Sequence, residues 1–85
     1  MNIDDILKQG PFKNEDDFTA EMSKTAGEKV LSRLDETFES REKGLAWLYT
    51  ACPALGGERP YDICKRGQTN LVIDELNRID HGMHS

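Results

Sequence analysis

The sequence predicts an all-α protein: a small bundle of about four to five helices, with a short helix between a glycine turn and the C-terminal helix. Apolar residues recur at three- and four-residue spacing along most of the chain, which is the spacing of one helix face. Glycine and proline separate these stretches, and no convincing alternation of apolar and polar residues indicates a strand. A chain of 85 residues buries only about two-thirds of its unfolded surface, so an oligomer or a partner would relieve its marginal stability.

The first part of the chain is expected to be a loosely held N-terminal arm, residues 1–13, followed by a helical domain, residues 14–85. Within the arm, residues 4–9 have a short helical pattern. Gly10 and Pro11 then stop it, because glycine suits a helix end and proline cannot continue the helix.

The segment 14–39 is predicted to be helical from its start at Asn14. An asparagine is a good N-cap, and the three acidic residues after it lie where the helix dipole favours negative charge. A stripe that steps by four residues marks one helix face but drifts around the helix, and Gly27 is the expected point of a break. One long helix and two shorter ones both fit. The stripe consists of Phe18, Met22, Ala26, Val30, Leu34 and Phe38.

The next helix is predicted to begin near Arg41, with Ser40 as its cap, and to end at Pro53. Leu45 lies on one side of this helix and Trp47 lies on the opposite side, about 200° away at 100° per residue. The helix is therefore apolar on both sides. Trp47 is either a core anchor or an aromatic residue of an interface, and the sequence leaves both open.

A glycine turn follows at residues 53–57, in which Leu55 is expected to fix the loop on the core. Pro60 suits the first position of a short helix, and Gly67 is its expected stop. The last helix is predicted to run from Gln68 or Thr69 to Asp80, with Gly82 just past its end. Its expected buried stripe is Val72, Leu76 and Ile79, with Leu71 and Ile73 at the edges.

The charge of the chain argues against nucleic acid and membrane as partners. Residues 1–40 carry ten acidic and five basic residues, and residues 41–85 carry six of each, within a net charge of −5. Binding to DNA is not expected of the chain alone, because phosphate contacts require a basic stripe. The sequence has no apolar run of roughly 20 residues, and its acidic start lacks the apolar region of a signal peptide, so we expect a cytoplasmic protein.

No group of residues has the spacing of a catalytic or metal-binding site, and we expect neither an enzyme nor a bound cofactor. Cys52 and Cys64 form no CxxC pair and are interpreted as small buried apolar residues. His81 and His84 lack further ligands for a zinc site, and His81 suits the end of a helix as a cation.

Several short motifs in residues 41–83 occur in an order that resembles the toxin-binding domain of the Xre/MbcA/ParS-type antitoxins. No single motif is specific, whereas the ordered set is. The segment from Ala26 to Phe38 is similar to the helix that precedes this pattern in the family. The motifs are Ala46-Trp47-Leu48, Pro53-Ala54-Leu55-Gly56-Gly57, Pro60-Tyr61-Asp62-Ile63, Gly67, and Leu76-Asn77-Arg78-Ile79-Asp80-His81-Gly82.

The resemblance implies the antitoxin of a type II toxin–antitoxin pair. The partner that it implies is a RES-type toxin, an enzyme that depletes NAD, and the C-terminal helix and tail would occlude its active site. A homo-oligomer or a toxin–antitoxin hetero-oligomer is also implied. The expected toxin-binding residues are Arg78, His81, Gly82, Met83 and His84, together with Leu55, Gly56 and Gly57 of the turn.

Two departures from the family pattern leave alternatives. Many members carry an N-terminal DNA-binding domain that represses their own operon, whereas only a short acidic segment precedes the common helix here. Cys52 also stands where an asparagine is common, which could change the capping of the turn. The alternatives are a DNA-binding autorepressor, which a gel shift would detect, and a dimerisation or adaptor module that has lost its toxin.

Overall fold

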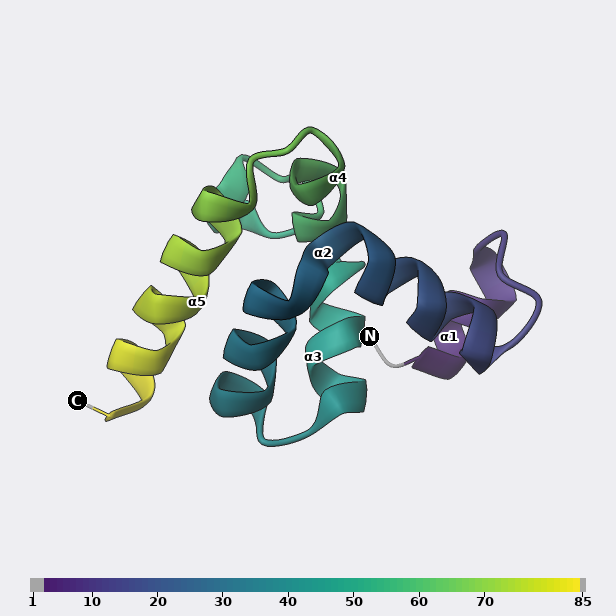
Figure 1. Cartoon of the computed structure of the whole chain (residues 1–85), viewed down its shortest axis with the longest axis horizontal. Coiled ribbons are helices and arrows are strands. Elements are labelled where there is room, and N and C mark those ends of the chain that lie inside the picture. The colour runs from purple at the N-terminus through teal and green to yellow at the C-terminus, as the bar shows by residue number, and fades with distance from the viewer. Residues whose placement is uncertain (1–2, 85) are drawn as a thin grey trace.

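The computed structural model describes residues 3–84, and the side chains of residues 3–82. Over these residues the fold is all-α, as the sequence predicts, with the short helix α4 between the glycine turn and the last helix (Figure 1). The elements are α1 (Ile3–Gln9), α2 (Glu15–Phe38), α3 (Arg41–Leu48), the 3-10 helix η1 (Pro53–Leu55), α4 (Pro60–Lys65) and α5 (Thr69–His84).

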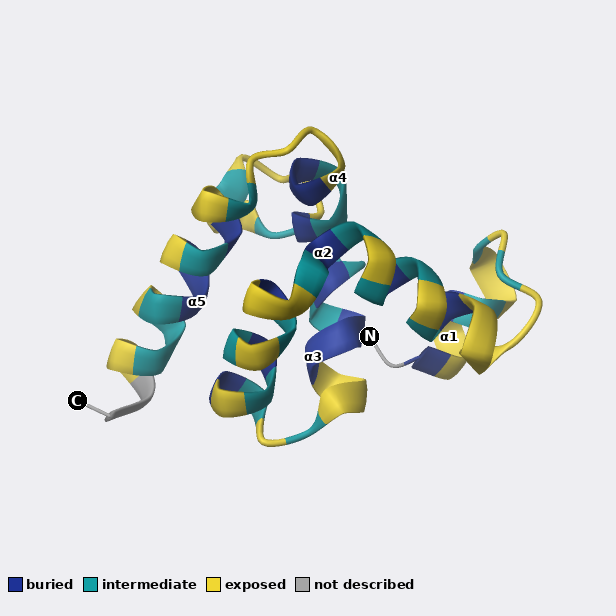
Figure 2. Ribbon diagram, viewed as in Figure 1, coloured by how far each residue is buried: buried dark blue, intermediate teal, exposed yellow. Residues whose placement is uncertain are grey.

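Helix α2 is the centre of the fold. It packs against α3, α4 and α5, while α1 contacts α2 and α3 from the other end of the molecule (Figure 1). The buried residues line the surfaces that these helices turn toward one another (Figure 2). The largest buried apolar side chains are Ile6, Phe18, Met22, Val30, Leu34, Leu45, Leu48, Ile63, Val72 and Leu76.

The predicted break in the long helix occurs at Gly27. Its backbone has φ 83° and ψ 168°, which is not helical, and it divides α2 into an N-terminal half, residues 15–26, and a C-terminal half, residues 28–38. Glycine tolerates a positive φ because it has no Cβ. The apolar stripe continues across the break, so both halves turn buried residues toward the same core.

The predicted caps of the two central helices are confirmed. The side chain of Asn14 accepts a hydrogen bond from the Asp17 N–H at 2.9 Å, and that of Ser40 accepts one from the Lys43 N–H at 3.4 Å. Each satisfies a donor that the first turn of a helix leaves without a partner.

Helix α1 is held more firmly than the expected loose arm. Ile3 and Ile6 are 8% and 2% exposed, and both belong to the core. Phe12, which follows the helix, packs edge-to-face on Phe18 and Tyr49 with ring centroids 5.1 and 5.4 Å apart. Ile3 and Ile6 are spaced as one face of a helix, and this spacing was a signal for burial.

Helix α3 ends at Leu48, earlier than the predicted stop at Pro53. Proline disfavours the helical conformation of the residue before it, and Cys52 is extended, with φ −115° and ψ 116°. Its backbone N–H donates to the Glu58 carbonyl at 3.0 Å, and this pairing closes the base of the glycine turn. The Cys52 side chain makes no capping hydrogen bond there.

Helix α5 is longer than predicted, because it continues through Gly82 to His84 rather than ending at Asp80. A glycine that ends a helix adopts a positive φ, as Gly67 does after α4 with φ 80°, and Gly82 does not. A glycine inside a helix costs about 1 kcal/mol relative to alanine, which weakens the last turn without ending it.

Candidate functional site

Helix α5 has two distinct faces. Val72 and Leu76 are fully buried against the bundle. On the outside, exposed residues are spaced so that they share one strip of the helix, which we call the outer face of α5. Leu71 is 47% exposed there, a large apolar side chain in contact with water. The outer face consists of Leu71, Asp74, Arg78, His81 and Gly82.

A groove lies between the outer face of α5 and the segment from η1 to α4. It brings together two regions that the sequence assigned to the site, because Leu55 of η1 and Arg78 of α5 both line it. Gly56 and Gly57 follow Leu55 as exposed residues with φ of 73° and 82°, so the backbone turns sharply at the rim. The groove is lined by Ala54, Leu55, Glu58, Ile63, Leu71, Asp74, Glu75 and Arg78.

Arg78 is held loosely on this surface. Its Nη1 lies 3.3 Å from Oε1 of Glu75, and the Arg78 side chain is 73% exposed while that of Glu75 is 10% exposed. An ion pair with so exposed a partner contributes little to folding, because water screens it. The guanidinium is therefore accessible to a carboxylate on another protein.

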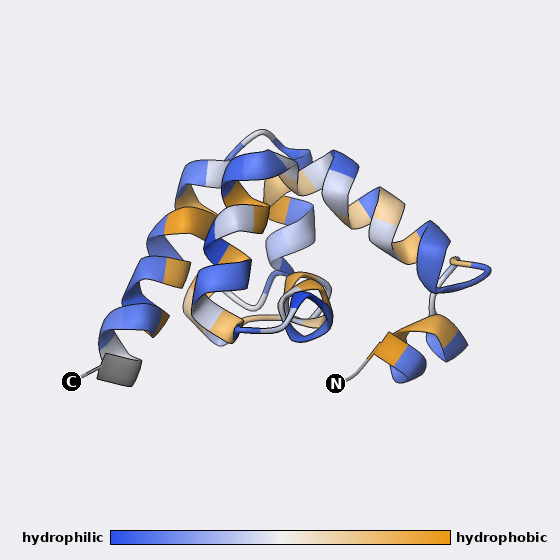
Figure 3. Cartoon of the chain, turned by 60° about the horizontal axis from the view of Figure 1, so that its bottom comes forward, coloured by the Kyte–Doolittle hydropathy of each residue, from blue (hydrophilic) through white to orange (hydrophobic). Residues whose placement is uncertain are grey.

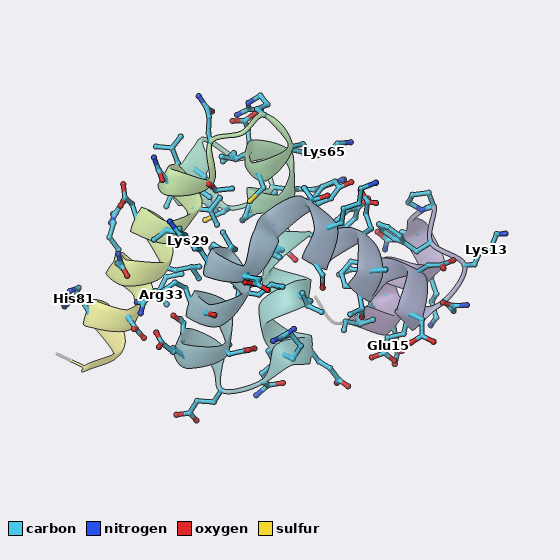
Figure 4. The ribbon with its side chains drawn as sticks, in the orientation of Figure 1. Lys13, Glu15, Lys29, Arg33, Lys65 and His81 are labelled. Atoms are coloured by element: carbon cyan, nitrogen blue, oxygen red, sulfur yellow. The ribbon has the colours of Figure 1, made fainter. Side chains whose placement is uncertain are left out.

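The remaining predicted residues lie toward the end of the helix. His81 points away from the bundle (Figure 4), and Gly82 is exposed beside it on the outer face. The backbones of Met83 and His84 continue α5, while their side chains lie outside the described residues. The predicted site thus occupies a strip along α5 and the rim of the glycine turn.

On α5, sequence reasoning missed three residues that line the groove: Leu71, Asp74 and Glu75. Their spacing from Arg78 is that of residues on neighbouring turns of a helix, and this was a usable signal. Leu71 was predicted only as the edge of a buried stripe, and burial of Val72 beside it turns Leu71 outward.

A second groove lies on the other side of α4, and several of its polar groups have partners within the chain. The Tyr61 hydroxyl donates to Oε2 of Glu21 at 2.7 Å, and Arg59 lies over the Tyr49 ring at 4.4 Å from its centroid. Burial and the bond to Glu21 raise the pKa of Tyr61 to about 12, and the same bond lowers the pKa of Glu21. The bond from Tyr61 to Glu21 joins α4 to α2, and Arg59 over Tyr49 joins the start of α4 to the end of α3.

The described residues give little support to catalysis. Burial raises the pKa of the Cys64 thiol to about 11, so it is not a thiolate at neutral pH. The hydrogen bond from Arg66 lowers the pKa of Glu58, which favours a fixed charge over proton transfer. No cluster of three or more metal-ligating side chains occurs in residues 3–82. Among the described helices, none has the length and apolar character needed to cross a bilayer.

The fold and its outer face are those of a small helical domain that offers a surface to a partner. Comparison with known families agrees: residues 33–82 match the family described as the antitoxin Xre/MbcA/ParS C-terminal toxin-binding domain, and the chain belongs to this family. The match runs from the C-terminal half of α2 into the last turns of α5 and includes Leu55, Arg78 and His81. No curated protein and no solved structure matches the chain.

Proposed function

We propose that this protein is the antitoxin of a type II toxin–antitoxin pair and that it neutralises a RES-type, NAD-depleting toxin by occluding the active site. The observation that carries the proposal is the family match, because the matched domain is a toxin-binding domain and residues 33–82 contain both sides of the groove. Neutralisation requires no catalysis by the antitoxin, and the complex would form in the cytoplasm.

The geometry suggests how the surface would bind. Protein interfaces place apolar or arginine anchors at their centre and less critical contacts around them. Leu71 supplies the apolar contact and Arg78 the charged one, and both line the groove. His81 and Gly82 lie further along the same face and would reach toward the entrance of the toxin's active site.

Occlusion predicts that the end of α5 is needed for neutralisation and dispensable for folding. Deletion of residues 82–85 leaves the buried residues Val72 and Leu76 in place, so the fold should persist. The truncated chain should fail to restore growth of cells that express the toxin, and its circular dichroism spectrum should retain the helical signal.

A matched pair of point variants tests the groove by itself. Arg78→Glu on the outer face should weaken capture of the toxin in a pull-down by at least about tenfold, because truncating or reversing an interface arginine is costly. Lys43→Glu makes the same charge change on the exposed surface of α3 and should capture the toxin normally.

Full neutralisation by the chain that lacks residues 82–85 would refute occlusion by the C-terminal end.

A further inference from the structure

The last turns of α5 have a polar attachment to the bundle in addition to their apolar one. Nη2 of Arg33, from the C-terminal half of α2, donates to Oδ1 of Asn77 at 2.6 Å and to Oδ2 of Asp80 at 3.1 Å. Arg33 lies between α2 and α5 in Figure 4. Since Asn77 and Asp80 lie on adjacent turns of α5, one guanidinium spans nearly a full turn of the helix.

Arg33 is itself well placed to act as a fixed point. In the sequence it lies between Val30 and Leu34, both fully buried, so its backbone belongs to a well-packed part of α2. Its Nη1 also pairs with Glu36, and the side chain is 30% exposed. A planar guanidinium with several partners is restricted in orientation, which a single flexible ammonium group would not be.

The apolar attachment of α5 weakens toward its end. Val72 and Leu76 are fully buried, Ile79 is only partly buried, and His81 and Gly82 are exposed. Gly82 also lowers the helix propensity of this turn. The last turn therefore depends on tertiary contacts in the region of Asp80 for its direction and its helical order.

We infer that Arg33 is a positioning residue, which holds the last turns of α5 in the direction required for binding the toxin. This inference rests on the proposed function. Arg33 is not expected to touch the toxin, because its guanidinium is engaged with Asn77, Asp80 and Glu36 on the side of α5 that faces α2. It acts on the toxin through Arg78, His81 and the residues after them.

The test compares the same substitution at two arginines. Arg33→Met removes the contacts to α5 and keeps a long apolar side chain. Arg41→Met is the matched control, because Arg41 makes two bonds to Asp35 at 2.7 and 2.6 Å that join the end of α2 to the start of α3. Arg33→Met loses the ion pairs with Glu36 and Asp80, and Arg41→Met loses the ion pair with Asp35. Only the first variant loses a contact with α5.

Three measurements are made on each full-length variant: thermal unfolding, amide hydrogen exchange of residues 78–84, and affinity for the purified toxin. Arg33→Met should raise exchange in this segment and weaken toxin affinity by about tenfold, through a faster dissociation of the complex. Arg41→Met should lower the unfolding temperature by an amount similar to that of Arg33→Met. It should change neither the amide exchange of residues 78–84 nor the affinity for the toxin. Arg33→Lys, which keeps the positive charge but lacks the planar guanidinium, should restore part of the affinity.

The inference is overturned if Arg33→Met leaves exchange unchanged, or if exchange rises while affinity stays within about twofold of the unaltered chain. Equal losses of affinity in Arg33→Met and Arg41→Met would also overturn it, since that result would indicate a general effect of stability. Failure of the unaltered chain to bind the toxin would instead refute the proposed function, and the inference with it.

Discussion

The two ends of the chain are both helical, yet they relate to the bundle in opposite ways. Helix α1 is held by burial: Ile3 and Ile6 lie in the core, and Phe12 packs among aromatic rings. Helix α5 is buried only along its inner face and leaves Arg78 and His81 in water. Figure 3 shows this division, with the apolar residues of α5 turned toward the bundle and hydrophilic ones along its outside.

The difference shows that α1 mainly stabilises the fold, whereas α5 also leaves a surface exposed that a partner could bind. Contacts that bury apolar side chains hold an element in place and leave little surface to offer. An exposed strip on a helix that is anchored along its opposite face can bind a partner without unfolding the domain. The family match includes most of α5 and does not extend to α1.

The largest expected effects come from removing a buried side chain from each of these two helices. Leu76→Ala should lower the free energy of unfolding by about 2–5 kcal/mol, because Leu76 is fully buried and its loss leaves a cavity. Ile6→Ala should cost a similar amount, which denaturant unfolding of both variants would measure. A change below about 0.5 kcal/mol for Ile6→Ala would show that α1 is the loose arm that the sequence suggested.

Alanine substitutions at two glycines should change the stability of the fold in opposite directions. Gly27 lies at the break in α2, and Gly82 lies in the last turn of α5. Gly27→Ala should destabilise by about 1–3 kcal/mol, because φ 83° with ψ 168° is a backbone conformation that alanine resists. Gly82→Ala should stabilise the last turn of α5 by up to about 1 kcal/mol, since that glycine is helical and a Cβ there meets nothing within 4 Å. Thermal unfolding of the two variants should show a decrease in stability for the first and an increase for the second. Stabilisation by Gly27→Ala would contradict the break in α2.

The smallest expected effect concerns the bond between Tyr61 and Glu21, and it depends on pH. Because this bond lowers the pKa of Glu21, its contribution is present at neutral pH and is lost as the pH falls below about 4. Because the pKa of Tyr61 is raised to about 12, the corresponding contribution is complete below about pH 10 and is lost as the pH rises through 12.

Tyr61→Phe should therefore destabilise by less than about 1 kcal/mol at pH 7 and should lessen the loss of stability between pH 5 and about pH 3. The control is Tyr49→Phe, which keeps the Tyr61–Glu21 bond. The unfolding temperatures of Tyr61→Phe, Tyr49→Phe and the unaltered chain are measured between pH 5 and about pH 3 and compared. Equal acid sensitivity in Tyr61→Phe and the unaltered chain would show that the bond contributes nothing.

Local signals in the sequence predicted much of the fold. Asn14, Ser40 and Gly27 act within a few residues of their own position, and their roles as caps and as a break are confirmed. The stop at Gly82 was wrong, because a glycine ends a helix only where the chain adopts a positive φ, and here the helix continues. Spacing alone does not distinguish these two uses of glycine.

Contacts between distant segments were beyond the sequence. The bonds from Arg33 to Asn77 and Asp80 and from Tyr61 to Glu21 join residues that no periodicity relates. The candidate site was predicted from an ordered set of motifs, and the groove between Leu55 and Arg78 depends on how α5 crosses the glycine turn. The packing of α5 against the glycine turn could not be predicted from this single sequence.

The proposed function requires that the outer face of α5 contacts the toxin, and site-specific photocrosslinking detects such a contact. A benzophenone amino acid replaces Asp74 on the outer face in one chain and Lys24 beside the second groove in another, both of them exposed positions. Irradiation of the complex should crosslink the toxin from position 74 and not from position 24. A crosslink from position 24 with none from position 74 would show that the toxin binds elsewhere.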